Sequence, residues 1–414
     1  MNWWEIGMYV RRHLEEAFKE AGRFFPALLV TGARQVGKTT FLRKIAEAER
    51  RFVSLDAPDM RQLARSDPRL FLSQYPPPVI IDEIQYAPEL LPYIKVAIDE
   101  ARFDNKKKAG GLFWLTGSQQ FQMMKGITES LAGRIGIFEL HGLSNRELSN
   151  TVNRPFRPDT FQADNPGETS TAAFFERVWM GAFPELATSS AARWSDFYGS
   201  YVQTYLARDV RDLTQVADLN RFYAFIKAVA ARTGQMLNYA SLARDADISQ
   251  PTAKQYVSVL EASGLVFRLY PYLRNHSRQM IRTPKIYMFD SGLAAYLTEW
   301  TTPAVMASGA MAGQFFETWC VSEILKSYAN AGLQPHVYYY RDKDQREIDL
   351  IIEQDGTLYP VEIKKGATFR PDDTKSFGAL KQFDKPVGMG ALVSLHPELF
   401  QIRQDCMAIP AVQL

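Results

Sequence analysis

Cysteine is nearly absent from this sequence of 414 residues, which contains only Cys320 and Cys406. The two lie far apart in the chain, so they form neither the ligand spacing of a zinc site nor a disulfide framework. No apolar run approaches the ~20 residues needed to span a bilayer, and the N-terminus lacks the continuous apolar core of a signal peptide. We therefore expect a cytoplasmic protein that does not enter a membrane.

The N-terminal stretch MNWWEIGMYVRRHLEEAFKE has apolar residues at helical spacing among its charges. One alternative is a helix on a membrane surface, with Trp3, Trp4, Met8 and Val10 inserted. An amphipathic first helix more commonly packs on its own domain, and we expect that arrangement here.

A large net charge is also lacking, because 48 basic and 46 acidic residues leave a formal charge of +2. This balance excludes the overall positive field of a nucleic-acid coat protein, so any DNA-binding surface must be local. With 46% hydrophobic and 23% charged residues, the composition is that of a globular protein rather than a disordered or coiled-coil chain. At about 150 residues per domain, the length predicts about three domains.

Residues 25–40 run from an apolar strand through the pattern G-x-x-x-x-G-K-T into a helix. Glycines let such a loop curl, so that backbone N–H groups point at the phosphates of ATP and the helix adds its positive end. Lys38 is predicted to bridge phosphate oxygens and the Thr39 hydroxyl to bind Mg²⁺. The alternative, an accidental glycine turn, is disfavoured because strand, loop and helix occur in the required order. The predicted nucleotide-binding residues are Gly32, Ala33, Arg34, Gln35, Val36, Gly37, Lys38, Thr39 and Thr40.

A second apolar run, residues 79–81, ends in the adjacent carboxylates Asp82 and Glu83. It resembles a Walker B strand, in which Asp82 would hold Mg²⁺ through water and Glu83 would polarise the attacking water. Any buried strand can end in acids, so the phosphate loop upstream is what gives this pattern its weight.

Two further positions are candidates for sensing the nucleotide. A strand at residues 111–117 leads into Ser118, a polar strand end of the kind that senses the γ-phosphate, with an ordinary turn as the alternative. Arg134 precedes another strand at residues 135–140 and is a candidate arginine finger for a neighbouring subunit. Its alternative role is a solvated helix cap.

Together these residues resemble the AAA-type ATPases, in particular prokaryotic proteins that fuse such a domain to a C-terminal domain of unknown function. Residues 180–185 look like the family element G-G-F-P-E, although Ala182 replaces its second glycine, and the resemblance makes Pro184 a nucleotide contact. Residues 205–210 resemble the signature Y-L-x-R-D-V, which makes Arg208 a second candidate finger. A turn and a plain amphipathic helix are the respective alternatives. The resemblance also implies a ring homo-oligomer, for which a hexamer is one form.

The middle of the chain predicts a connection, a helical lid and a winged helix. Residues 150–171 are polar and broken by proline, which is typical of a surface connection. From residue 221 the order of helices, a turn and a strand predicts a winged helix. Its second helix carries small polar groups that suit the phosphates and base edges of DNA, and a basic stripe follows that helix. The alternative to DNA binding is a module that only packs against protein. These candidate DNA-facing residues are Ser249, Gln250, Thr252 and Lys254, then Arg268, Arg274, His276, Arg278, Arg282 and Lys285.

The C-terminal part contains Asp349, followed on the next predicted strand by Glu362 and Lys364, with Glu317 on a helix ahead of them. This is the pattern of restriction-endonuclease-like nucleases, in which Glu317, Asp349 and Glu362 would bind Mg²⁺ and Lys364 would activate a water. Cross-strand salt bridges are the alternative. Asp290 follows a strand-like run and is expected to be structural.

We therefore predict an α/β protein with four parts. These are a P-loop AAA-type ATPase core (1–150), a linker and helical lid (151–217), a winged helix (218–285) and a restriction-endonuclease-like domain (286–414). The predicted function is ATP hydrolysis coupled to the binding or remodelling of DNA or another nucleic acid, with a nuclease domain whose activity the sequence does not decide. The alternative is a slow-turnover nucleotide switch that recognises a protein or nucleic-acid partner.

Overall fold

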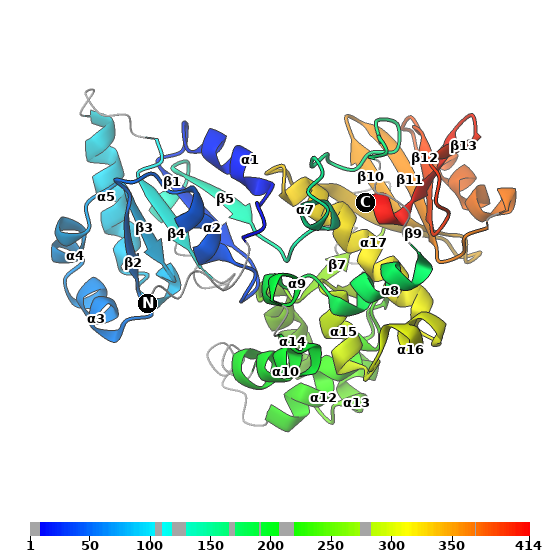
Figure 1. Cartoon of the computed structure of the whole chain (residues 1–414), viewed down its shortest axis with the longest axis horizontal. Helices are drawn as coiled ribbons and strands as arrows, with labels where there is room; N and C mark the ends of the chain where they lie inside the picture. Colours follow the sequence, from blue (N-terminus) through cyan, green and yellow to red (C-terminus); the bar gives the residue numbers. More distant parts are fainter. Residues whose placement is uncertain are drawn as a thin grey trace.

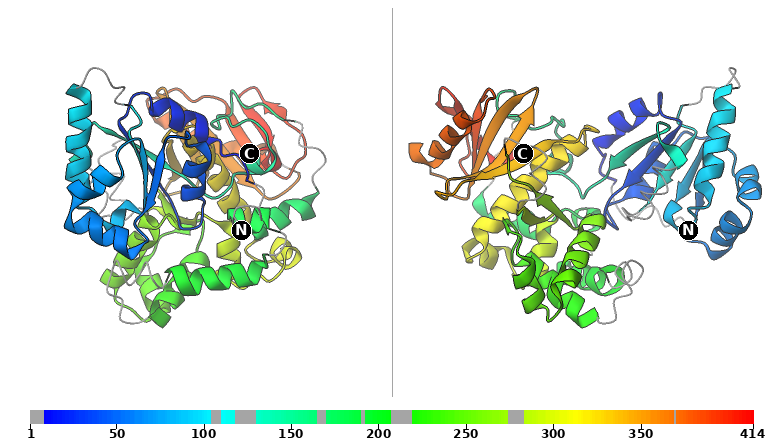
Figure 2. Two further views of the ribbon diagram at one scale, coloured as in Figure 1. Left: turned by 60° about the vertical axis from the view of Figure 1, so that its left-hand side comes forward. Right: turned by 180° about the vertical axis from the view of Figure 1, so that it is seen from behind.

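A computed structural model describes residues 9–103, 110–117, 130–164, 170–189, 192–206, 219–273, 283–368 and 370–414. In Figure 1 the N-terminal sheet and its helices lie on the left, and a second sheet, from the C-terminal part, lies on the right. A group of helices below joins the two. Figure 2 shows the same three parts from two further directions.

The N-terminal sheet contains five parallel strands in the order β2-β3-β4-β1-β5. Their bounds are β1 (Ala27–Thr31), β2 (Arg51–Ser54), β3 (Val79–Asp82), β4 (Phe113–Thr116) and β5 (Ile135–Glu139). Every residue of β1, β3 and β4 is buried, as expected for a parallel sheet that is covered on both faces. The carboxyl ends of these strands meet at one edge, which places the predicted phosphate loop and Asp82 side by side.

Helices cover both faces of this sheet (Figure 1). They are α1 (Leu14–Ala21), α2 (Lys38–Ile45), α3 (Pro58–Ser66), α4 (Pro68–Gln74) and α5 (Leu90–Phe103), with a 3-10 turn η1 (Ile84–Tyr86). Successive β1 residues pack on opposite faces: Leu28 and Val30 toward α1 and α2, Leu29 toward α3 to α5. Phe18 of α1 makes edge contacts with the rings of Phe41, Trp114 and Phe138. The first helix therefore packs on its own domain, whereas Trp3, Trp4 and Met8 lie outside the described residues.

The segment after β5 crosses to the other parts of the chain through α7 (Asn145–Leu148) and residues 151–164. Phe156 in this segment is only 4% exposed. Its N–H donates to Ser327 Oγ (2.9 Å), and its carbonyl accepts from the Tyr328 hydroxyl (2.7 Å). Most of residues 151–164 are exposed or half-buried, but the buried ring at position 156 anchors this connection to a helix.

The middle region is mainly helical, and its first helix packs against later ones rather than on the N-terminal sheet. The elements before the small sheet are α8 (Thr171–Met180), α9 (Pro184–Thr188), α10 (Trp194–Ser200) and the π-helix η2 (Tyr201–Leu206). Then come α12 (Leu219–Ala230), β6 (Gln235–Met236), α13 (Tyr239–Asp245), α14 (Gln250–Ala262), β7 (Val266–Leu269) and β8 (Lys285–Met288). Strands β6, β7 and β8 form an antiparallel sheet in the order β6-β8-β7.

Three helices lead to the C-terminal sheet: α15 (Ser291–Leu297), α16 (Pro303–Ser308) and the long, largely buried α17 (Ala312–Ala329). The sheet is mixed and has the order β13-β14-β12-β11-β10-β9. Its elements are β9 (His336–Arg341), β10 (Glu347–Gln354), β11 (Thr357–Lys364), η4 (Pro371–Gln382), β12 (Gly390–Ser394), β13 (Phe400–Arg403), β14 (Cys406–Pro410) and η5 (Ala411–Gln413). Helix α17 packs on β11 and so joins the middle region to this sheet.

One buried cluster of apolar residues runs from Leu14 in α1 to Leu414, so the three parts share a continuous core. Cys320 and Cys406 are both buried, free cysteines. Across the described ranges, we find no helix whose length and apolar character would let it cross a membrane.

Candidate functional site

The loop between β1 and α2 has the backbone that its glycines were expected to supply. Gly32 and Gly37 have φ angles of 138° and 91°, in the region that residues with a side chain rarely adopt. A methyl group on Gly32 would lie 2.0 Å from the Leu140 carbonyl oxygen, so only glycine fits there. Gly37 is the N-cap of α2, which turns the positive end of that helix toward the loop.

Lys38 begins α2 and folds back over the loop. Its side chain is buried, and its ammonium donates to the carbonyl oxygens of Gly32 (3.0 Å) and Ala33 (2.8 Å). These bonds hold a positive charge at the centre of the curled backbone, which is where the sequence predicted a phosphate. The other predicted nucleotide-binding residues, Arg34, Gln35, Val36 and Thr40, lie on the same turn or on the first turn of α2.

The side chains of Thr39 and Asp82 meet at the carboxyl edge of the sheet. The Thr39 hydroxyl donates to Asp82 Oδ1 at 2.7 Å, and the Thr116 hydroxyl donates to the same atom at 2.6 Å. Ser54 Oγ donates to Asp82 Oδ2 at 3.2 Å. Mg²⁺ prefers hard oxygen ligands and accepts one or two protein groups beside substrate phosphates, so this hydroxyl and carboxylate fit that ion.

Glu83 has left-handed backbone angles, φ 58° and ψ 49°, which are uncommon for a residue with a side chain. Its N–H donates to Thr116 Oγ1 (2.9 Å), and its carboxylate accepts from the Gln85 amide. Such conformations occur at functional sites because surrounding contacts hold them. Thr116 thus orients both acids, and sequence reasoning missed it, although a polar residue ending the neighbouring strand β4 was a usable signal.

Arg12 is a further residue that the sequence did not reveal. Its guanidinium, 3% exposed, donates to the carbonyls of Val36 (2.9 Å) and His141 (2.7 Å) and to Glu147 Oε1 (3.0 Å). Burial raises the pKa of Glu147, but the charge of Arg12 together with the N–H groups of Ser144 and His13 outweighs burial, and the net shift is downward. Arg12 therefore fixes the phosphate loop to the segment after β5, through contacts between residues distant in sequence.

The middle region lies against the phosphate loop at two points. A methyl group on Gly37 would lie 3.9 Å from Pro184 Cγ, and one on Gly264 would lie 3.1 Å from the Ala33 nitrogen. The turn before Pro184 is held by Asp290, whose carboxylate accepts from the Ala182 N–H (2.7 Å) and the Tyr198 hydroxyl (2.7 Å). Asp290 also caps α15, so it is structural, as expected.

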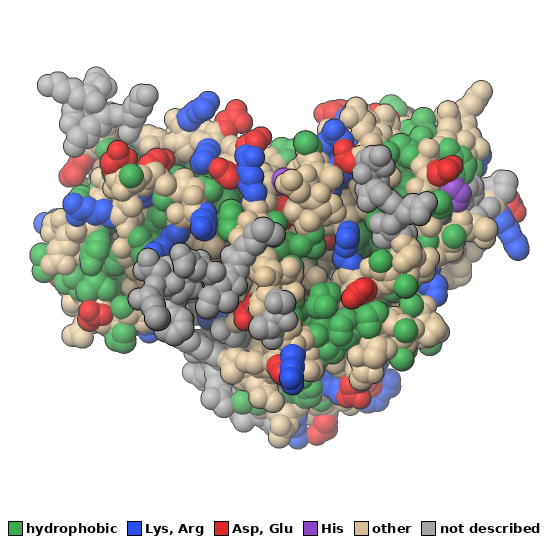
Figure 3. Space-filling view, in the orientation of Figure 1, with side chains coloured by type: hydrophobic (Ala, Val, Ile, Leu, Met, Phe, Trp, Pro, Cys, Tyr) green, Lys and Arg blue, Asp and Glu red, His purple; other side chains and the backbone are tan. Residues whose placement is uncertain are grey.

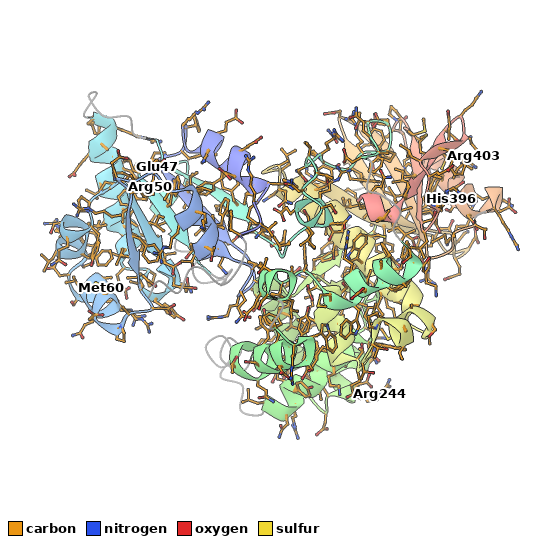
Figure 4. The ribbon with its side chains drawn as sticks, viewed as in Figure 1. Glu47, Arg50, Met60, Arg244, His396 and Arg403 are labelled. Atoms are coloured by element: carbon orange, nitrogen blue, oxygen red, sulfur yellow. The ribbon has the colours of Figure 1, made fainter. Side chains whose placement is uncertain are left out.

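Arg134 lies before β5, at the amino edge of the sheet and away from this chain's own phosphate loop. Its guanidinium pairs with both carboxylate oxygens of Asp99 on α5, at 2.7 and 3.0 Å. Arg50, which Figure 4 shows beside Glu47, lies before β2 at the same edge. The predicted positions Ser118 and Arg208 lie outside the described residues.

The second predicted site is assembled from α17, β10 and β11. Asp349 Oδ2 accepts from the Ile363 N–H (2.8 Å), and Glu362 Oε1 pairs with Lys364 Nζ (2.6 Å). Glu317 accepts from the Tyr287 hydroxyl at 2.6 Å. Burial, followed by the charges of Glu317 and Glu362, raises the pKa of Asp349 well above its usual range.

A lysine, Lys285, lies against two of the three acids that were predicted to bind a metal, Glu317 and Asp349. Lys285 Nζ lies 2.5 Å from Glu347 Oε1, 3.2 Å from Glu317 Oε1 and 3.9 Å from Asp349 Oδ1. Burial lowers the pKa of Lys285, but the three carboxylates reverse this effect and raise it. The acids around it do not fit a divalent ion as arranged, and within the described ranges no three Asp, Glu, His or Cys side chains form a group that could hold a metal.

The predicted DNA-facing residues are only partly available. Lys285 is buried and Arg268 pairs with Glu261, so neither belongs to an exposed basic stripe, which corrects the prediction for both. Ser249 caps α14 by accepting from the Thr252 N–H. Gln250 and Lys254 are exposed on α14. The stripe residues Arg274, His276, Arg278 and Arg282 lie outside the described residues.

Three family models match successive parts of the chain. Residues 25–149 match an AAA domain, residues 171–304 a domain of unknown function (DUF8612), and residues 312–414 a second domain of unknown function (DUF4143).

Similar proteins of full length are also found. An uncharacterized protein of Mycobacterium tuberculosis, Rv2008c, is 29% identical over 415 residues, which cover 98% of this chain and 84% of the relative. Among solved structures, a Walker-type ATPase of Pyrococcus abyssi is 17% identical, with a TM-score of 0.41, over 70% of this chain and 96% of that one. Cdc6p of Pyrobaculum aerophilum is 12% identical, with a TM-score of 0.24, over 69% of this chain and 91% of that one.

Proposed function

We propose that this protein binds ATP with Mg²⁺ and hydrolyses it, because residues 25–149 match an AAA domain, followed by matches to two domains of unknown function. The observation that carries the proposal is the convergence of Lys38, Thr39, Asp82 and Glu83 at one edge of the parallel sheet. At this edge a curled backbone, an ammonium group, a hydroxyl group and two carboxylates meet where the triphosphate of a bound nucleotide would end.

The residues divide the work as follows. The loop N–H groups and Lys38 bind and orient the phosphates, since their charge lies at the centre of the curl. Thr39 and Asp82 would hold Mg²⁺, which would neutralise charge on the phosphates. Glu83 accepts the proton of the attacking water, and Thr116 keeps it beside Asp82.

The test of nucleotide binding is Lys38→Ala, measured by titration with a fluorescent ATP analogue. We expect it to lose most of its affinity, because the only ammonium inside the loop is removed. Lys44→Ala, on the exposed side of the same helix, is the matched control and should bind as wild type does. Equal affinities for Lys38→Ala and wild type would contradict the proposed site.

Our further proposal is that nucleotide turnover is coupled to the binding of DNA or another nucleic acid by the winged-helix segment. Support comes from the element order of residues 219–288 and from exposed polar side chains, Gln250 and Lys254 on α14. Arg244, on the preceding helix α13, is also exposed (Figure 4). The contacts of Pro184 and Gly264 with the phosphate loop provide the route of coupling. We also propose a ring homo-oligomer, a hexamer as its first candidate, with Arg134 or Arg208 reaching a neighbour's nucleotide.

Steady-state ATP turnover with and without duplex DNA tests this coupling. We expect DNA to stimulate wild type and the stimulation to fall in Lys254→Glu, because α14 would repel phosphates. Lys343→Glu makes the same charge change on a distant, exposed turn and should leave the stimulation intact. Negligible turnover with retained ADP would instead support the alternative, a slow nucleotide switch. Metal-dependent cleavage of nucleic acid is not part of the proposal, because Lys285 sits among the acids that it would need.

A further inference from the structure

The C-terminal acids surround a side chain from another part of the chain. Lys285 begins β8 of the small sheet, whereas Glu317 lies on α17 and Glu347 and Asp349 lie on β10. The side chain of Lys285 is 4% exposed, and its three acidic neighbours face it from two different elements. A buried ammonium is stable only when it is paired, so these contacts are a condition of its burial.

An ammonium and a divalent metal compete for the same oxygen atoms at such a place. Mg²⁺ would need carboxylate oxygens at about 2.1 Å, and the ammonium already draws the oxygens of Glu347 and Glu317 toward itself. Glu317 Oε1 also accepts from the hydroxyl of Tyr287, which lies two residues after Lys285 on β8. Both partners of Glu317 therefore come from β8.

Glu362 is a further buried acid of this group, and its partner is a second lysine, Lys364. It is 6% exposed, its Oε1 pairs with Lys364, and its Oε2 has no hydrogen-bond partner within the described part of the chain. A buried carboxylate oxygen without a donor is costly, and a nearby cation relieves that cost. Burial raises the pKa of Glu362 to about 7, and the charges of Glu317 and Glu347 act in the same direction, so all these acids share one neighbourhood.

We propose that the Lys285 ammonium is the resident cation of this site, that it takes the place of a divalent metal, and that it ties β8 to α17 and β10. The acids predicted to bind Mg²⁺ then serve to lock the small sheet to the C-terminal sheet. Removal of the ammonium should convert the same acids into a site for a divalent ion. This inference does not depend on the proposed ATPase activity.

The test compares the full-length wild type with Lys285→Met, using Mn²⁺ alone as the probe. Thermal unfolding is followed over increasing Mn²⁺ concentrations, and bound Mn²⁺ is counted by electron paramagnetic resonance. In wild type, we expect Mn²⁺ to cause no rise in melting temperature that Asp349→Asn would remove. In Lys285→Met, the melting temperature should rise with each increase in Mn²⁺. The rise should disappear in Lys285→Met/Asp349→Asn. Lys326→Met removes another buried, paired lysine and should gain no Mn²⁺ response.

Two results would overturn the proposal. One is Mn²⁺ binding by wild type that Asp349→Asn abolishes, because the site would then hold a metal with Lys285 in place. The other is a folded Lys285→Met that ignores Mn²⁺. If Lys285→Met does not fold, Lys285→Met/Glu347→Gln removes one charge of each sign, and the same comparison is made with it. The wild-type measurement decides the first result without any variant that removes Lys285.

Discussion

Asp82 shows how single residues at the sheet edge depend on neighbours from several strands. Its carboxylate accepts from Thr39, Thr116 and Ser54. Thr39 lies at the start of α2, whereas Thr116 ends β4 and Ser54 ends β2. Thr116 in turn holds the backbone of Glu83 in its left-handed conformation. Substitution of such a positioning residue would move the acids even though it makes no contact with phosphate.

His141 gives the molecule a pH dependence at the residue scale. Burial, then the charges of Lys326 and Arg12, lowers the pKa of His141 from 6.5 to about 3, and its ring stacks on Phe289. Between these pH values the unfolded chain binds a proton that the folded chain does not, so this contribution to stability is complete above pH 6.5 and falls toward pH 3. The loss approaches about 1.4 kcal/mol per pH unit.

Urea unfolding between pH 7 and pH 4 measures this effect in wild type, His141→Gln and His336→Gln. His141→Gln should show a shallower decline in the free energy of unfolding, because it has no proton to take up. His336 is exposed on β9, and His336→Gln should follow the wild-type decline. Parallel curves for all three proteins would refute the assignment to His141.

At the scale of elements, Asp290 connects three of them. It caps α15 through the Leu293 N–H, holds the turn before α9 through the Ala182 N–H, and accepts from Tyr198 of α10. The position of Pro184 over the phosphate loop therefore depends on a carboxylate at the end of β8.

Asp290→Ala should lower the free energy of unfolding by about 3 kcal/mol, because it removes a cap, leaves the Ala182 N–H without its acceptor and removes one of the two acceptors of the Tyr198 hydroxyl. Ser249→Ala removes only the cap of α14 and should cost about 1 kcal/mol. Urea titrations at neutral pH measure both values. Similar losses for the two variants would mean that Asp290 acts as an ordinary helix cap.

The sequence predicted the features whose pattern lies within one segment, and it did not predict contacts between residues that are far apart in the chain. Strands β1, β3, β4 and β5 and the phosphate loop have local periodicity or spacing, and the structure has them where they were predicted. The predicted winged helix ended at residue 285, whereas β8 (Lys285–Met288), whose residues were mostly assigned to the next domain, is the central strand of the small sheet. Lys285 was misread, because it looked like part of an exposed basic stripe within its own segment and is buried by a distant one. Arg12 could not be found, since its partners lie 24 to 135 positions away.

At the scale of the whole molecule, the polypeptide after β5 ties its halves together. The Asn145 N–H donates to Glu323 of α17 (2.8 Å), and Arg146 donates to the Gln413 carbonyl (2.9 Å), near the C-terminus (Figure 1). A cavity of about 280 Å³ remains between β5, β7 and the end of α17, lined by Ile137 and Phe267 among others. On the face in Figure 3, basic and acidic side chains are interspersed, in keeping with the net charge of +2.

At the edge of the N-terminal sheet, Glu83 is proposed to accept the proton of the water that attacks ATP. The rate of phosphate release by Glu83→Gln measures this role. The variant should bind ATP as wild type does, because the phosphate loop is unchanged, but its turnover should fall by about 10²-fold or more. The matched control is Glu89→Gln, an exposed position before α5. Turnover by Glu83→Gln equal to that of wild type would contradict the account.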